Sequence, residues 1–227
     1  MKEKVILVLG LPLIAFAADN QQAPLKGSDY ISTDVGSTYT YVMTDPKDPT
    51  KTVENYQFIV KSCNENKTEC LYDNKQFLGV ESPVIVAETK YEVKDGAVYM
   101  TTIKTLGEDN VLHDTNDKPQ IFFPEDIILN KVDKTNSSSE DSSYEGTTVF
   151  TKVIPEITVN GNTYNDCIRM DNEGTQTYKE EESKSKDYEV YCKGVGLVTE
   201  TFSSYNPKTK KYDQKDVTVS LYSISKK

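Results

Sequence analysis

Short alternating segments separated by two-residue turns are the feature that most constrains the fold of this chain. In residues 84–104, Asp95-Gly96 separates two segments in which apolar and polar side chains alternate. Asp-Gly in this position is typical of a type I′ β-hairpin. One face of the hairpin is then largely apolar and the other largely polar, which supports a single register. The register pairs Val93 with Val98, Tyr91 with Met100, Thr89 with Thr102, Glu92 with Tyr99 and Lys90 with Thr101.

Similar segments run through the rest of the chain, with a second two-residue turn at Asn160-Gly161. Residues 124–129 are the one candidate for a helical turn, because Pro124 suits the first position of a helix. No repeated alternation of strands and helices is present, so the expected fold is mainly β. It is an antiparallel sandwich or a curved half-barrel sheet with at most one short helix. Strands are predicted at 38–43, 55–63, 69–72, 147–152, 156–159, 163–170, 175–180, 187–193, 195–203 and 217–224.

The first seventeen residues have the pattern of an export signal. Lys2 and Lys4 precede an apolar run of about twelve residues, too short to span a bilayer, and Ala15-Phe16-Ala17 fits a cleavage site. We therefore predict a signal peptide at 1–17 and one β-rich domain at 18–227, with a mobile Ser-rich loop at 134–146. No cysteine directly follows the cleavage site, so we expect a periplasmic or secreted protein without a lipid anchor or a transmembrane segment.

The composition indicates a thin aliphatic core and argues against nucleic-acid binding. Apolar residues make up 36% of the chain, and fifteen tyrosines contribute to that share. Loss of Lys2, Glu3 and Lys4, which sum to +1, would change the net charge from −10 to −11. An acidic chain with a single arginine, Arg169, is poorly suited to phosphate backbones.

All four cysteines lie after the predicted signal peptide, and an even number in an exported chain indicates disulfides. Three pairings are possible. We predict Cys63–Cys70, which brackets a polar hairpin loop, and Cys167–Cys192, which joins two strands expected to be neighbours. Zinc is the alternative, but the spacings differ from those of zinc knuckles.

No set of residues indicates catalysis or cofactor binding. The single histidine, His113, precedes Asp114, and neighbouring side chains diverge on a strand, so an exposed position is expected. The acidic residues cluster at predicted turns, and Gly-x-Ser-x-Gly, His-Glu-x-x-His and Cys-x-x-Cys are absent. The 171–174 segment, Asp-Asn-Glu-Gly, lacks the order of an EF-hand loop. We therefore predict no catalytic residue, metal ligand or cofactor.

Tyrosines in the predicted strands are the remaining candidates for a ligand-facing surface. Tyr91, Tyr99, Tyr188 and Tyr191 are the four we select. If tyrosines lined one concave face, they would form a surface suited to an apolar ligand or a carbohydrate. The alternative is that they are ordinary strand residues, since tyrosine is enriched in strands without any ligand.

Three motifs resemble a group of bacterial exported or lipid-anchored β-rich proteins of unknown function. Residues 35–41, Val-Gly-Ser-Thr-Tyr-Thr-Tyr, resemble the group's opening Val-Gly-x-x-Trp/Tyr-x-Tyr. Residues 157–168 are similar to its central strand-turn-strand. Residues 191–198, Tyr-Cys-Lys-Gly-Val-Gly-Leu-Val, resemble its closing Tyr-x-Lys-Gly-Val-Gly-Leu-Val, with Cys192 where the group has a small residue. The resemblance implies a β-rich envelope protein and identifies no catalytic residue.

Three functions are compatible with these observations. The first is non-enzymatic binding of an apolar ligand or a protein partner by an exported envelope or secreted protein. The second is a surface interaction or structural module. The third, which the missing motifs make the weakest, is a hydrolase that uses carboxylates.

Overall fold

A computed structural model describes residues 24–45, 48–77, 82–138, 142–178, 181–206, 211–212 and 217–226. The predicted signal peptide lies outside these ranges, so it stays a prediction. Within the described residues the chain forms one large antiparallel sheet and one small two-stranded sheet. The mainly β, antiparallel fold predicted from the sequence is confirmed as a curved sheet.

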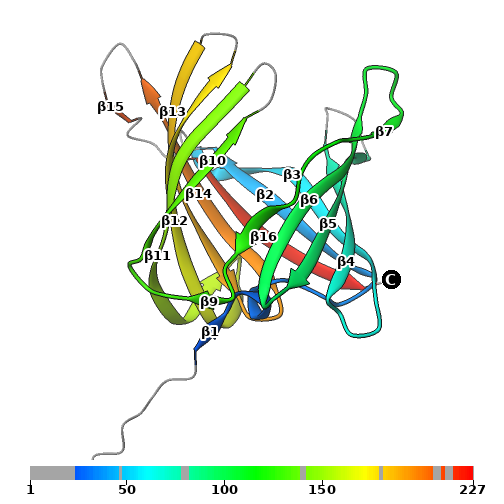
Figure 1. Cartoon of the computed structure of the whole chain (residues 1–227), viewed down its shortest axis with the longest axis horizontal. Coiled ribbons are helices and arrows are strands. Elements are labelled where there is room, and N and C mark those ends of the chain that lie inside the picture. Colours follow the sequence, from blue (N-terminus) through cyan, green and yellow to red (C-terminus); the bar gives the residue numbers. More distant parts are fainter. Residues whose placement is uncertain are drawn as a thin grey trace, which may run out of the picture.

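The large sheet bends so that β11 and β12 stand opposite β5 and β6, with β2, β16 and β14 between them (Figure 1). Its strand order is β10-β11-β12-β13-β14-β16-β2-β3-β4-β5-β6-β7, so the last strand lies between β14 and β2. The strands of this path, in chain order, are β2 (Ser37–Asp45), β3 (Asp48–Cys63), β4 (Glu69–Gln76), β5 (Val84–Lys94), β6 (Ala97–Leu106), β7 (Leu112–Asp114), β10 (Val132–Ser138), β11 (Ser142–Val159), β12 (Asn162–Tyr178), β13 (Glu181–Cys192), β14 (Gly196–Asn206) and β16 (Val217–Lys226).

The hairpins follow the turn chemistry of the sequence. Asp95 and Gly96 both have positive φ, as a type I′ turn requires, and β5 pairs with β6 in the predicted register. Asn160 and Gly161 also have positive φ and form the turn between β11 and β12. A short β15 (Lys211–Tyr212) pairs with β14. Local turn signals were therefore sufficient to define the β5–β6 and β11–β12 pairings.

A segment between β7 and β10 crosses the concave side of the sheet, and we call residues 120–131 the strap. Its β8 (Gln120–Phe123) pairs with β6, and its β9 (Asp126–Ile127) pairs with β1 (Leu25–Lys26). At its far end Asn130 N donates to Phe150 O of β11 at 2.8 Å. The strap thus links the two arms of the sheet, and Figure 1 shows it passing across their lower ends.

The helical turn predicted at 124–129 is wrong, because part of this segment pairs as β9. Ile127 pairs with Leu25 and is buried in a cluster with Phe123 and Phe150, whereas an isolated helical turn is costly to nucleate. The short helix of the described residues is instead a 3-10 helix, η1 (Gly27–Tyr30). Gly27 lets it approach the strap, since a Cβ there would collide with Pro124 O and Phe123.

The loop expected at 134–146 is also wrong for the described residues. Residues 134–138 belong to β10 and residues 142–146 to β11, while 139–141 lie outside the described part. Gly146 pairs with Gly174 of β12, and the ring of Tyr144 covers both glycines, a contact that supports glycines inside a sheet. The polar composition of this segment therefore did not reveal two paired strands, of which β11 pairs on both sides and β10 on one side.

Both predicted disulfides are present, Cys63–Cys70 between β3 and β4 and Cys167–Cys192 between β12 and β13. Strict alternation would put Tyr164 and Cys167 on opposite faces, yet both belong to one buried cluster. Asp166 between them has a φ of 53°, and this local irregularity interrupts the alternation. Disulfides of this kind are typical of proteins from an oxidising compartment.

Two buried clusters form the core. One lies along β2, β4, β12, β13, β14 and β16 and includes Tyr41, Val198 and Leu221. The other gathers Tyr30, Phe123, Phe150 and further residues beneath the strap. Tyrosine and phenylalanine rings supply much of both clusters, as the thin aliphatic composition suggested. Among the described residues, no helix has the length and apolar character needed to cross a bilayer.

Candidate functional site

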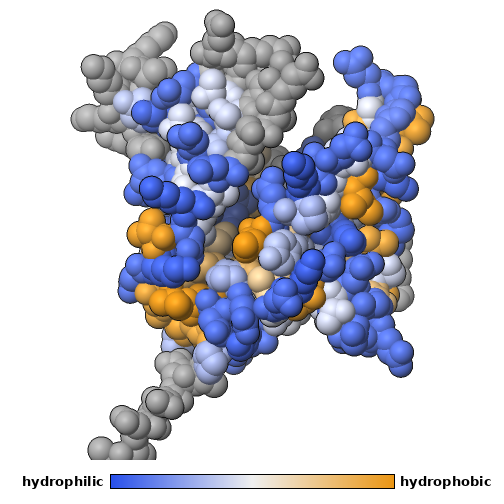
Figure 2. All heavy atoms as spheres, in the orientation of Figure 1, coloured by the Kyte–Doolittle hydropathy of each residue, from blue (hydrophilic) through white to orange (hydrophobic). Residues whose placement is uncertain are grey.

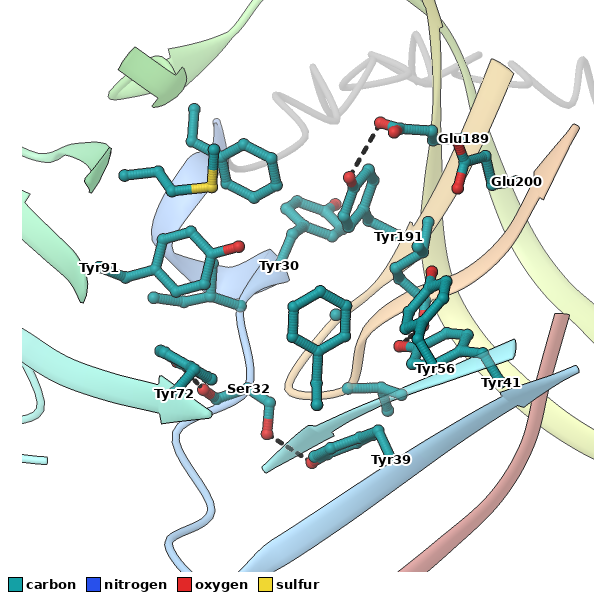
Figure 3. Close-up of a pocket in the computed structure, with 17 residues that line it drawn as sticks. Tyr30, Ser32, Tyr39, Tyr41, Tyr56, Tyr72, Tyr91, Glu189, Tyr191 and Glu200 are labelled. Atoms are coloured by element: carbon teal, nitrogen blue, oxygen red, sulfur yellow. Dashed lines mark hydrogen bonds between the residues drawn. The ribbon is translucent and has the colours of Figure 1, made fainter. Parts of the chain in front are cut away.

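A cavity of about 230 Å³ lies on the concave side, where η1 and the strap meet the sheet. In Figure 2, apolar and pale side chains appear in the hollow between the two arms, whereas the coloured residues higher on the arms are mostly hydrophilic. Seven of the lining residues are tyrosines, and Figure 3 shows them arranged around the space. The described lining residues are Tyr30, Ile31, Ser32, Tyr39, Tyr41, Tyr56, Phe58, Tyr72, Tyr91, Met100, Phe122, Glu189, Tyr191, Val195, Gly196, Leu197 and Glu200.

The rings contact one another around the cavity. Tyr41 stacks on Tyr56 with ring centroids 4.6 Å apart, and Tyr91 stacks on Phe122 of the strap at 5.2 Å. Phe122 also meets Tyr191 edge to face at 5.7 Å. These contacts join β2, β3, β5, β13 and the strap, so segments far apart in sequence shape one aromatic lining.

Four of the tyrosine hydroxyls are held by partners within the protein. Tyr41 donates to the carbonyl of Leu197 at 2.8 Å, and Tyr191 donates to Glu189 Oε2 at 2.8 Å. Tyr39 is hydrogen-bonded to Ser32 Oγ, and Tyr72 donates to the carbonyl of the same residue. These bonds fix the ring orientations and attach the segment after η1 to the sheet.

The hydroxyls of Tyr30, Tyr56 and Tyr91 have no hydrogen bond to the described residues. All three line the cavity, and burial raises the pKa of each, with nearby acidic groups adding to the effect. The pKa of Tyr30 reaches about 12. These neutral hydroxyls are therefore available to a molecule in the cavity as donors or acceptors.

Two glutamates are the charged groups among the described lining residues. Glu189 of β13 and Glu200 of β14 are direct cross-strand partners. Desolvation raises the pKa of Glu189 to about 8, and the negative charge of Glu200 adds to this, while the Tyr191 hydrogen bond acts in the opposite direction. Burial also raises the pKa of Glu200, and the charge of Asp187 adds to it. At neutral pH the pair therefore holds one proton to a large extent.

The structure places two of the four selected tyrosines in the cavity lining and two outside it. Tyr91 and Tyr191 line the cavity. Tyr188 lies outside the cavity lining, where its ring packs against the Arg169 guanidinium at 3.9 Å. Tyr99 is likewise absent from the lining and pairs with Ile121 of the strap. Alternation explains the result, because Tyr188 and Tyr191 are three residues apart and point to opposite faces of β13.

Sequence reasoning missed Tyr30, Tyr56, Phe58, Phe122 and both glutamates as site residues. For Glu200 a signal was available, since it alternates with Val198 and Phe202 on what is otherwise an apolar face. Glu189 alternates in the same way with Tyr191. The expectation that acidic residues cluster at solvated turns is wrong for this pair and also for the buried Glu88 of β5.

His113 lies on the edge strand β7, as expected, and is exposed. Its Nε2 contacts Asp109 Oδ1 at 2.8 Å rather than Asp114. Among the described residues, no group of three or more His, Cys, Asp or Glu side chains has the arrangement of a metal site. The candidate site is therefore the aromatic cavity.

Two solved structures are similar to this chain in fold. A candidate exported protein with a YmcC-like fold from Bacteroides fragilis has 12% sequence identity and a TM-score of 0.55, covering 87% of this chain and 99% of its own. A candidate lipoprotein from Parabacteroides distasonis has 16% identity and a TM-score of 0.53, covering 86% and 98%. At these identities the likeness shows the fold alone. No protein-family model and no curated protein matches the chain.

Proposed function

We propose that this is an exported, non-enzymatic binding protein that holds a small, largely apolar ligand in the tyrosine-lined cavity. The convergence of seven tyrosines from η1 and five strands on one cavity carries this proposal. Ligand pockets are mostly apolar concave sites with a few placed polar groups, which describes this lining. Export is supported by the predicted signal peptide, by the two disulfides and by the names of both structural neighbours.

A tryptophan reporter tests the proposal, because the chain contains no tryptophan. Phe122→Trp puts one indole beside Tyr91 in the cavity, and Tyr222→Trp puts one on an exposed position of β16 as the matched control. We expect benzyl alcohol, cyclohexanol or a cationic ring compound to change the emission of Phe122→Trp in a saturable way. The emission of Tyr222→Trp should stay constant.

The indole of Phe122→Trp could itself fill the cavity, so two further measurements use the unchanged protein. Calorimetric titration with the same compounds should show saturable heat. Native mass spectrometry of protein purified from its own host should show a retained small molecule. No change in emission, no saturable heat and no retained molecule would together contradict the proposal.

Glu189 and Glu200 also keep the carboxylate hydrolase as a second candidate, since raised carboxyl pKa values occur at catalytic sites. The geometry suits it less well. Both carboxylates project from adjacent positions of one wall, whereas glycoside hydrolysis needs two groups that flank the scissile bond. Turnover of any glycoside or ester that disappears in both Glu189→Gln and Glu200→Gln would favour the hydrolase over simple binding.

A further inference from the structure

The cavity combines aromatic walls with acidic groups and, among its described lining residues, contains no lysine, arginine or histidine. We propose that its ligand is a small organic cation, an amine or a quaternary ammonium compound, held between the tyrosine rings with its positive charge facing Glu189 and Glu200. This inference rests on the proposed function, because it names the ligand class of the same cavity.

The aromatic lining favours a cation for an electrostatic reason. The face of each aromatic ring carries negative potential, so a cation close to several rings is attracted to all of them, and more strongly when water is excluded. The stacked Tyr41–Tyr56 and Tyr91–Phe122 pairs lie on different sides of the space, as Figure 3 shows for the labelled tyrosines. A cation between them would exchange its water for ring faces.

The two glutamates add formal negative charge that the described protein leaves without a basic partner. Each one is half-buried toward the cavity, and the ion pairs of the described residues do not include either of them. A buried carboxylate normally has a cation or several donors beside it. Here Tyr191 supplies one donor to Glu189, and a bound cation would supply the missing charge.

The cavity volume limits the size of the ligand. At about 230 Å³ it exceeds a cavity of about 150 Å³ that accepts benzene, and it lies below the range of roughly 300–1,000 Å³ typical of drug-sized ligands. The free hydroxyls of Tyr30, Tyr56 and Tyr91 are too few for a polyhydroxylated sugar, whose many hydroxyls each need a partner. One charged head with a short apolar or ring-containing group fits better.

Binding of a cation should be coupled to release of a proton. Glu189 is faced by Glu200 of β14, by Asp187 and Tyr191 of its own strand, and by the Tyr56 and Tyr91 hydroxyls of β3 and β5. With these neighbours the pKa of Glu189 is about 8, so the acid is mostly protonated at pH 7. A cation selects the ionised form, which is about one tenth of the population at pH 7 and about nine tenths at pH 9.

Two matched pairs of probes test the charge directly by calorimetric titration. Choline is compared with 3,3-dimethylbutan-1-ol, its uncharged carbon isostere, and 2-phenylethylamine with 2-phenylethanol. We expect each cation to bind at least about tenfold more tightly than its alcohol at pH 9. The choline affinity should fall about tenfold from pH 9 to pH 7, while the affinity of both alcohols stays constant.

Variants connect the preference to the glutamates. The Glu189→Gln/Glu200→Gln protein should bind each cation and its alcohol about equally, with the alcohol affinity close to that of the unchanged protein. Removing two buried charges should not impair folding, so loss of preference is not a folding effect. Glu156→Gln, at an exposed position of β11, removes one surface charge and should keep the preference.

The outcomes separate this inference from the proposed function. Equal or tighter binding of the alcohols would overturn the cation assignment and leave the binding function standing. A cation preference that survives in the double variant would overturn the role of the glutamates and with it this inference. Absence of heat with all four probes would count against both proposals.

Discussion

The cavity has two walls built from the same kind of antiparallel strands, and they differ in how their buried polar groups find partners. On the aromatic wall, formed by β2 to β5, the hydroxyls of Tyr39, Tyr41 and Tyr72 are bonded to Ser32 or Leu197. Those of Tyr56 and Tyr91 on the same wall have no partner among the described residues, and they carry no formal charge. On the acidic wall, formed by β13 and β14, Glu189 has one tyrosine donor and Glu200 has none among the described residues. Satisfied groups stabilise the fold, whereas unsatisfied groups are free to interact with a ligand.

The largest expected effect comes from removing the disulfides beside the two walls. Cys167–Cys192 joins residues 25 apart beside the acidic wall, and Cys63–Cys70 joins residues 7 apart beside the aromatic wall. By loop-closure entropy, the Cys167→Ser/Cys192→Ser protein should lose about 3.5 kcal/mol of unfolding free energy and the Cys63→Ser/Cys70→Ser protein about 2.4 kcal/mol. Urea unfolding measures both. Equal midpoints for the two variants would contradict the ranking.

The acidic wall should also make stability depend on pH. The folded pKa of Glu189, about 8, lies above its ordinary value of 4.5, so its contribution is fully present below about pH 4.5 and is lost as pH rises to 8. Each pKa unit corresponds to about 1.4 kcal/mol, and solvent screening of the half-buried side chain reduces the total, so we expect a loss of about 2–3 kcal/mol.

Glu189→Gln should remove most of this loss, which urea unfolding at pH 5 and pH 8 measures. Some slope should persist, because the pKa values of Glu200 and Asp187 are raised as well. Glu156→Gln is the control and should keep the full slope. A flat profile in the unchanged protein would show that the carboxyl pair is better solvated than its burial indicates.

The smallest expected effect compares two hydroxyls. Tyr41→Phe removes the donor to the part-buried Leu197 carbonyl and should destabilise the protein by about 1–2 kcal/mol. Tyr91→Phe removes a hydroxyl without a partner among the described residues and should change stability by less than about 0.5 kcal/mol. Thermal unfolding of the two variants measures the difference. A larger loss for Tyr91→Phe would mean that its hydroxyl has a structural role.

Much of the sheet could be predicted because its signals are local. Asp95-Gly96 and Asn160-Gly161 define hairpins through their own backbone conformations, and the register of β5 and β6 follows from alternation. The errors arose where distant segments decide the outcome. Residues 126–127 pair with 25–26, and residues 143–146 pair with both β10 and β12.

The candidate site was predictable only in part. Tyr91 and Tyr191 could be selected as strand tyrosines, but the same rule selected Tyr99 and Tyr188, which lie outside the cavity lining. Alternation separates Tyr188 from Tyr191, but it does not tell which face of β13 becomes concave. Elsewhere an irregularity such as that at Asp166 of β12 changes which face a residue occupies. One such shift is enough to defeat a prediction from alternation.

The sequence by itself determined the mainly β class and the hairpin turns, because turn conformation and alternation act over a few residues. The Cys167–Cys192 bridge, predicted among three possible pairings, depends on β12 and β13 lying side by side. Only the tertiary structure decided that the sheet curves, that the strap crosses it, and that Glu189 and Glu200 share a cavity with seven tyrosines. Desolvation and charge repulsion depend on which groups meet in space. The alternating segments establish the two walls, and the chemistry of the cavity exists only once those walls face each other.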